Sequence, residues 1–229
     1  MTSQKIAIGL VAVALFAVVV SVHAADIDAG FKAYQRGEYA TAIQIFRLLA
    51  DQGNAAAQFN LGLMYDKGQG VTQVYAEAVK WYRKAADQGD VEAQTNLGTM
   101  YINGRGVPQD YGAAMRWYRK AADQGTAKAQ TNLGNMYVNG LGVTQDYAAA
   151  LRWYRKAANQ GGTLAQASLG FMYNKGQGVK QDYAEAIKWF RKAADQGNAS
   201  AQYNLGFMYN KGQGGTQDYA EAIKWFRKA

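Results

Sequence analysis

The chain of 229 residues contains no cysteine, a single proline and a single histidine. Without cysteine it can form neither a disulfide nor the acylated cysteine that anchors a bacterial lipoprotein. The histidine, His23, falls in a segment that we expect to be removed, so the mature chain would have none. These absences exclude Ser-His-Asp and Cys-His nucleophile systems, and zinc sites with His or Cys ligands. An all-carboxylate metal site or an acid/base carboxylate pair stays open.

Residues 1–24 have the layout of a secretory signal peptide. Lys5 carries a positive charge, residues 6–20 form an apolar run, and a Val-His-Ala cleavage site ends at Ala24. We expect cleavage before Ala25 and a mature protein that is periplasmic or secreted in a bacterium. The alternative is a retained membrane anchor, but the apolar run is short for a span of ~20 residues.

A period of 36 residues runs through the rest of the chain. All five tryptophans follow it, together with five tyrosines and five alanines: Trp81, Trp117, Trp153, Trp189 and Trp225; Tyr75, Tyr111, Tyr147, Tyr183 and Tyr219; Ala57, Ala93, Ala129, Ala165 and Ala201. A fixed period of this size is typical of a stacked solenoid, in which one supersecondary unit recurs and buries its apolar side on its neighbours. Function should therefore lie on repeated surfaces rather than in one pocket.

Each period contains two predicted helices, called helix A and helix B from here on. In residues 54–89, helix A carries an apolar stripe that includes Gly62 and ends at Gly68. Glycine costs a helix roughly 1 kcal/mol relative to alanine, so its recurrence at this position predicts a close approach of another helix. Four copies offer a favourable N-cap residue for helix A: Asn54, Asp90, Thr126 and Asn198.

Helix B has its own boundary signals. In the last two copies Glu185 and Glu221 lie three residues after the N-cap and complete a predicted capping box. The Gly-x-Gly motif between helices A and B ends a helix instead of following a strand, which favours a turn over a phosphate-binding loop. Four copies begin helix B with an aspartate N-cap: Asp110, Asp146, Asp182 and Asp218. Two helices of about a dozen residues joined by short turns form an αα-hairpin.

The predicted organisation is a leader, a degenerate unit and five repeats. The leader is residues 1–24, the degenerate capping unit is residues 25–53, and the repeats are residues 54–89, 90–125, 126–161, 162–197 and 198–229. The last repeat is truncated at Ala229 without a polar capping helix. We expect this end either to self-associate or to be the edge of a longer protein.

The repeated motif reads Ala-Gln-x-Asn-Leu-Gly-x-Met-Tyr, then Gly-x-Gly-Val, Asp-Tyr and Ala-x-x-Trp-Tyr/Phe-Arg-Lys-Ala-Ala-Asp-Gln-Gly. It resembles the Sel-1-like repeat, a relative of the tetratricopeptide repeat, in five copies over residues 54–229. The resemblance implies an all-α, right-handed superhelical solenoid of helix-turn-helix repeats that acts as a protein–protein scaffold. Some secreted relatives bind penicillin or act as β-lactamases, but those carry a disulfide in each repeat, and this chain has none.

Comparison of the five copies shows which helix-A positions vary and are free to serve a partner. In a tetratricopeptide-like arrangement these positions face the concave groove, where exposed aromatics suit a peptide or partner helix. Drift at surface positions or packing between neighbouring repeats are the alternatives. The predicted partner surface is Phe59, Leu63, Thr95, Thr99, Thr131, Asn135, Phe171, Asn174, Tyr203, Phe207 and Asn210. We expect a neighbouring asparagine series, which begins at Asn60, to form structural bonds between repeats.

Helix B carries basic residues in register, and they account for the formal net charge of +8. One interpretation is a solvated outer face on which arginine stems cover tryptophan. The other is a basic ridge that holds an anionic partner. The predicted contacts of that ridge are Lys80, Arg83, Arg116, Arg119, Arg152, Arg155, Lys188 and Arg191.

The leading prediction is an exported, non-catalytic scaffold that binds a peptide or partner protein through the concave helix-A face. The first alternative is a module that binds a cell-wall component or another anionic polymer through the basic ridge. The second is a hydrolase of cell-wall or β-lactam substrates, but it would have to rely on Asp, Glu, Lys or Tyr. No catalytic residue, cofactor, metal or nucleic-acid partner is expected.

Overall fold

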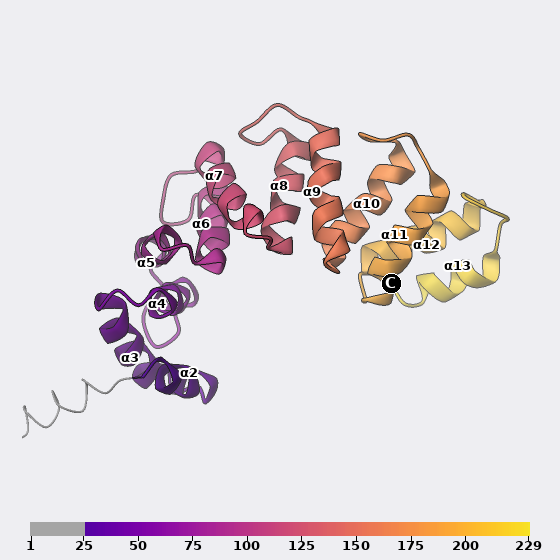
Figure 1. Ribbon diagram of the computed structural model, residues 1–229. Helices are drawn as coiled ribbons and strands as arrows, with labels where there is room; N and C mark the ends of the chain where they lie inside the picture. Colours follow the sequence, from indigo (N-terminus) through magenta and orange to yellow (C-terminus); the bar gives the residue numbers. More distant parts are fainter. Residues whose placement is uncertain (1–25) are drawn as a thin grey trace, which may run out of the picture. The chain divides into compact units, whose positions relative to one another are not determined.

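The computed structural model describes residues 26–229, so the predicted signal peptide lies outside the described residues. Within this range the chain forms twelve α-helices and no strand (Figure 1). They are α2 (Ile27–Gln35), α3 (Tyr39–Asp51), α4 (Ala55–Lys67), α5 (Tyr75–Asp87), α6 (Val91–Asn103), α7 (Tyr111–Asp123), α8 (Ala127–Asn139), α9 (Tyr147–Asn159), α10 (Thr163–Lys175), α11 (Tyr183–Asp195), α12 (Ala199–Lys211) and α13 (Tyr219–Phe226). Helices α4, α6, α8, α10 and α12 are the predicted helices A; α5, α7, α9, α11 and α13 are the predicted helices B.

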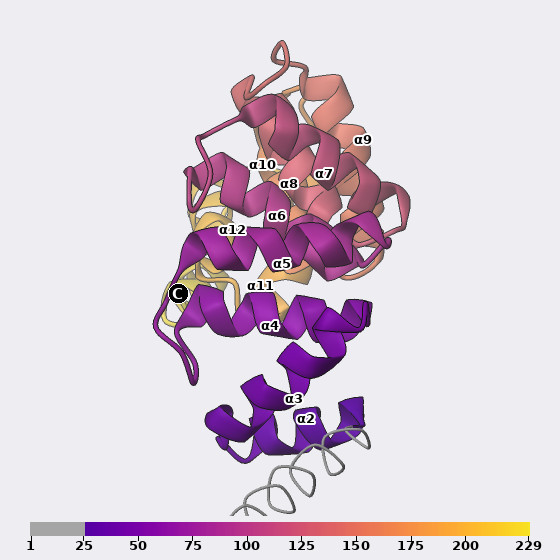
Figure 2. The same ribbon diagram turned by 90° about the vertical axis from the view of Figure 1, so that its left-hand side faces the viewer.

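The chain divides into two compact units at Gln109/Asp110. In unit 1, each of the helices α2 to α6 packs on the next, and Figure 2 shows α4 and α5 lying alongside each other. In unit 2, each of the helices α7 to α13 likewise packs on the next. The predicted fold class, an all-α solenoid of stacked helix-turn-helix repeats, is confirmed.

None of the helices within residues 26–229 is long and apolar enough to cross a membrane.

Most of the predicted helix boundaries are correct. The side chains of Asn54, Asp90 and Asn198 accept a backbone N–H at the start of their helix A. Asp110, Asp146, Asp182 and Asp218 do the same for helix B.

Two predicted cap details are wrong. Thr126 makes no side-chain cap hydrogen bond, because its hydroxyl donates to the Ala121 carbonyl. In place of the predicted capping box, the carboxylate of Glu185 binds Lys188 at 2.9 Å and that of Glu221 binds Lys224 at 2.8 Å. A lysine three residues along the helix therefore takes the carboxylate that was expected to bind the N-cap backbone.

The glycine in the middle of helix A marks a close helix approach, as predicted. A Cβ atom on Gly134 would lie 2.4 Å from the ring of Tyr154, and one on Gly170 would lie 2.5 Å from the ring of Phe190. The aromatic ring at this position of helix B therefore lies directly on the helix-A backbone. Tyr82, Tyr154 and Phe190 are all buried in this way.

Burial of this ring has a consequence at high pH. Burial raises the pKa of the Tyr154 hydroxyl to about 12 and also raises that of Tyr82. The folded state holds this proton more tightly than the unfolded state does. The contribution of Tyr154 to the free energy of unfolding is therefore fully present below pH 10 and is lost as the pH rises from 10 to 12. For Tyr154 the loss is roughly 2–3 kcal/mol.

The measurement is urea unfolding at pH 9 and at pH 11.5, with Tyr154→Phe as the comparison. Phenylalanine occupies the same position in α11, as Phe190, so the variant is expected to fold. Its stability should depend less on pH than that of the wild type. If the stability of the two proteins depended equally on pH, the raised pKa of Tyr154 would be refuted.

Candidate functional site

Exposed aromatic side chains gather on the helix-A side of unit 2. Phe171 on α10 is 38% exposed, and on α12 Tyr203 is 56% and Phe207 39% exposed. These two helices contact each other. The inner edges of two of the rings pack on helix B, since Phe171 contacts Phe190 and Tyr203 contacts Phe226, at ring-centre distances of 5.1 and 5.6 Å. Phe171 and Tyr203 are therefore anchored on one side and open to solvent on the other.

Amide and apolar groups extend this face toward α8. Asn135 is exposed, and its side-chain oxygen accepts a 2.6 Å hydrogen bond from Tyr154. Asn174 and Asn210 are half-buried. A groove of about 320 Å³ runs between the first turns of α8 and α10, and Leu164, which is 66% exposed, lines one side of it. We call Phe171, Tyr203, Phe207 and these neighbours the aromatic face.

The other predicted partner residues are less accessible. Thr95 and Thr131 are buried, and their hydroxyls donate to the Val91 and Ala127 carbonyls of their own helices. Thr95 is therefore withdrawn from the predicted partner surface, whereas Thr131 contributes to it only as part of the wall of the groove between α8 and α10. In unit 1, Leu63 and Thr99 are half-buried, and so is Phe59, whose ring packs on Tyr82 at 5.9 Å.

The basic residues of helix B are exposed, and many of them bind aromatic groups. Arg119 and Arg155 donate to the hydroxyls of Tyr137 and Tyr173 on the following helix A, at 2.8 and 2.7 Å. Arg83 and Arg191 make the corresponding bonds to Tyr101 and Tyr209. Lysines lie over tryptophan rings, for example Lys156 at 4.5 Å from the centre of Trp153. Much of the ridge thus covers the aromatic layer beneath it while its charges stay in solvent.

The ridge is least neutralised in the middle repeats. Lys80 and Lys188 pair with Glu77 and Glu185, at 3.4 and 2.9 Å. Alanine replaces that glutamate in α7 and α9, and Arg116 and Arg152 form no ion pair with any described residue. These two arginines are therefore the predicted ridge contacts most available to an anion.

Sequence reasoning missed the glutamines that join successive repeats. Gln166 is 5% exposed; its amide donates to the Ala158 carbonyl at the end of the preceding helix B, and its side-chain oxygen accepts from Gln196 at 2.7 Å. The equivalent bonds join Gln58 to Ala50 and to Gln88 in unit 1. The available signal was a glutamine that directly follows the buried alanine of helix A in all five copies. A buried amide needs hydrogen-bond partners, so its recurrence indicates a structural bond.

The asparagine series is only partly as expected. Asn60 and Asn204 donate to the Ala56 and Ser200 carbonyls within their own helices, and not between repeats. Asn96 and Ser168, by contrast, lie near the hydroxyls of Tyr82 and Tyr154 on the preceding helix B, although those hydroxyls donate to Asp66 at 3.4 Å and to Asn135 at 2.6 Å.

No group of three His, Cys, Asp or Glu side chains in residues 26–229 is placed to hold a metal ion.

Comparisons with known proteins agree with this architecture. The Sel1 repeat family matches residues 55–90, 91–126, 127–162, 163–198 and 199–229. A comparison with curated proteins found no match.

Solved structures give closer likenesses. A protective antigen from uropathogenic Escherichia coli, with an SLR fold, is 42% identical at a TM-score of 0.82. That match covers 88% of this chain but 44% of the antigen, so this chain spans less than half the antigen's length. A Sel1 repeat protein from Oxalobacter formigenes is 38% identical at a TM-score of 0.83, covering 88% of this chain and 80% of that one. A putative Sel1 repeat protein from Klebsiella pneumoniae is 26% identical at a TM-score of 0.52, covering 79% and 88%.

The five matched repeats run from residue 55 to the last residue given, and two solved structures share more than a third of their aligned residues with this chain. The chain therefore belongs to the Sel1 repeat family, whose members are generally scaffolds for protein–protein interaction.

Proposed function

We propose that this chain is an exported, non-catalytic scaffold that binds a partner protein through the aromatic face of unit 2. The observation that carries the proposal is the exposure of Phe171, Tyr203 and Phe207 on two contacting helices. In the other repeats the position of Tyr203 is taken by Phe59, Thr95, Thr131 and Ala167, each half-buried or buried.

The chemistry of the aromatic face suits a peptide or a helix of a partner protein. Large aromatic rings contribute most to binding when they are held rigid at one edge and desolvated by a partner. Phe171 and Tyr203 meet the first condition through their ring contacts on helix B. The amides of Asn135, Asn174 and Asn210 offer hydrogen bonds to a backbone. Aromatic anchors with adaptable polar neighbours are typical of partner-binding surfaces.

Two exposed tyrosines in the same repeat provide the test. Tyr203 lies on helix A and is 56% exposed, whereas Tyr219 lies on helix B and is 60% exposed. With the partner captured by the immobilised wild-type chain, we expect Tyr203→Ser to weaken its binding roughly tenfold to thirtyfold, which corresponds to the loss of about 1.4–2 kcal/mol. Tyr219→Ser should leave binding unchanged. Equal losses for both variants would contradict the proposal.

The export part of this proposal is supported by the leader pattern of residues 1–24. Mass spectrometry of the protein isolated from its native cells should find a mature chain that begins at Ala25. A chain that retains residues 1–24 and stays in the cytoplasm would overturn the export proposal and leave the binding face unaffected.

A second candidate function is a module that binds an anionic envelope polymer, and the unpaired Arg116 and Arg152 favour it. Binding of this kind falls steeply with salt, because ions screen exposed charges. Arg116→Gln combined with Arg152→Gln should then reduce the binding of purified cell wall at 50 mM salt. Binding that is insensitive to both the substitutions and the salt would eliminate this candidate.

A further inference from the structure

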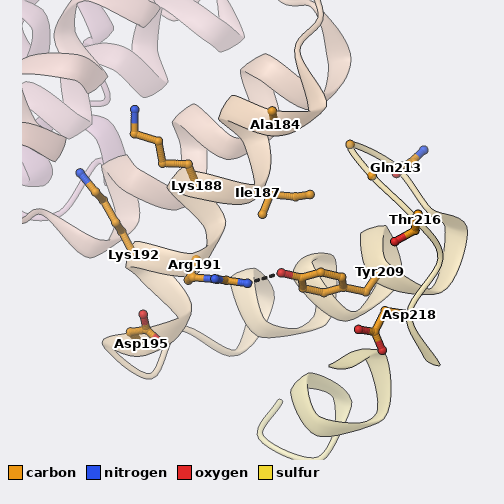
Figure 3. Close-up of a pocket in the computed structure, with 12 residues that line it drawn as sticks. Ala184, Ile187, Lys188, Arg191, Lys192, Asp195, Tyr209, Gln213, Thr216 and Asp218 are labelled. Atoms are coloured by element: carbon orange, nitrogen blue, oxygen red, sulfur yellow. Dashed lines mark hydrogen bonds between the residues drawn. The ribbon is translucent and has the colours of Figure 1, made fainter. Parts of the chain in front are cut away.

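A groove recurs between helix B of one repeat and the turn that follows helix A of the next. In unit 1 it has a volume of about 440 Å³ and lies between α5 and Val107. In unit 2 it lies between α11 and the turn of residues 212–218, and its volume is about 630 Å³ (Figure 3). This size is within the range of 300–1,000 Å³ that ligand sites usually have.

The larger groove lies where the repeat motif loses a side chain. The third residue after the C-cap glycine is valine in four repeats and glycine in the last: Val71, Val107, Val143, Val179 and Gly215. The four valines are half-buried, and Val179 packs on the core cluster of its unit. Gly215 is exposed, and a Cβ atom built on it would meet nothing within 4 Å. The last groove therefore has an open apolar position that the chain itself fills elsewhere.

The floor of the open groove is apolar, and its border carries three cations of α11 together with two carboxylates, Asp195 at the end of that helix and Asp218, which accepts the Glu221 N–H as the N-cap of α13. Figure 3 shows Ile187 extending from α11 toward the turn and Arg191 bound to the hydroxyl of Tyr209. Lys188 and Lys192 rise from the same helix on the side away from the turn (Figure 3). Lys192 lies over the Trp189 ring at 4.5 Å, and no described carboxylate pairs with it.

In the turn that carries Gly215, the side chain of Gln213 makes fewer hydrogen bonds than the equivalent Gln69 makes in the first Sel1 repeat. The side-chain oxygen of Gln213 is buried without a hydrogen-bond partner in the described structure. At the same position in unit 1, the Gln69 oxygen accepts from Tyr34 at 2.7 Å, and the Gln69 amide donates to Tyr39 at 3.2 Å. The wall of the groove thus holds an acceptor that nothing in the repeat satisfies.

We infer that this groove binds an extended acidic segment of a partner protein. A valine-sized aliphatic side chain of that segment occupies the space opposite Ile187 that Gly215 leaves empty, and carboxylates on either side of it bind Arg191 and Lys192. The occupant supplies the apolar group that the chain's own valine provides in the other turns. Its negative charge complements Arg191 and Lys192, because Lys188 alone among the three cations is neutralised by a glutamate and neither Asp195 nor Asp218 forms an ion pair with them in the described structure.

This groove is separate from the aromatic face, so the inference stands or falls independently of the proposed function. The probe is a fluorescent peptide, Glu-Asp-Glu-Val-Asp-Glu, measured against the mature chain by anisotropy at 50 mM salt. Gly215→Val should weaken binding about tenfold or more. The variant is expected to fold, because the backbone at Gly215 is outside the positive-φ region and the added side chain meets open space.

Val179→Gly is the matched gain-of-function variant, because it opens the equivalent position one repeat earlier. It should raise the stoichiometry from one peptide per chain to two. Replacing the peptide's valine by serine, or Lys192 by glutamine, should weaken binding severalfold. The inference is overturned if Gly215→Val binds the peptide as the wild type does. It is equally overturned if the chain ignores the peptide but binds phosphatidylglycerol vesicles regardless of residue 215.

Discussion

Gly106→Ala is expected to lower the free energy of unfolding by about 2–5 kcal/mol. Gly106 has a φ of +71°, and a Cβ atom there would lie 2.4 Å from the carbonyl carbon and oxygen of Tyr75. Alanine would be destabilised by the left-handed backbone, by roughly 1–2 kcal/mol. Displacing the first turn of α5 would cost roughly 1–3 kcal/mol more. The measurement is chemical unfolding followed by circular dichroism.

Gly89→Ala is the control for backbone conformation alone. Gly89 also has a positive φ, of +94°, but a Cβ atom there would meet nothing within 4 Å. We expect a loss of about 1–2 kcal/mol for this variant. If the two alanine variants were equally stable, the close contact between the Gly-x-Gly turn and the preceding helix B would be wrong.

Gln166→Leu is expected to lower the free energy of unfolding by about 1–3 kcal/mol. The buried Gln166 satisfies the Ala158 carbonyl of α9 and accepts from Gln196 at the end of α11. Leucine is of similar size but removes both hydrogen bonds. The Ala158 carbonyl keeps the Gly161 N–H and the Gln196 amide keeps the Gly161 carbonyl, so the loss is that of two hydrogen bonds at about 0.5–1.5 kcal/mol each. Unfolding by urea is the appropriate measurement.

Gln181→Leu is the matched control in the same repeat. Gln181 is exposed and donates a single 2.8 Å hydrogen bond to the Asn174 carbonyl, which water can replace. Its substitution should cost less than about 1 kcal/mol. A larger loss for Gln181→Leu than for Gln166→Leu would show that the turn, and not the buried glutamine series, fixes the spacing of the repeats.

The helices and their ends were predictable because each depends on local sequence. Cap residues such as Asp146 and terminal glycines such as Gly68 act within one turn of the helix they bound, and the 36-residue period repeats those signals. The close approach at Gly134 was also predictable, since a helix tolerates a repeated glycine only for a reason such as packing.

The candidate surfaces were less predictable because accessibility depends on neighbouring repeats. Thr131 varies among the copies like an exposed residue, yet the structure buries it. Asn60 and Asn96 share one position, but only Asn96 meets a tyrosine hydroxyl from another helix. In the sequence, the open groove is visible only as the replacement of a recurring valine by Gly215. The structure was needed to show that Gly215 and Ile187 line the same groove.

The central claim is that a partner protein binds the aromatic face of unit 2. The most direct measurement places a photoreactive amino acid at residue 203 on helix A or at residue 219 on helix B, in the full chain expressed in its native cells. We predict that residue 203 yields one discrete adduct with another protein and that residue 219 does not. The same adduct from residue 219 with none from residue 203 would contradict the account.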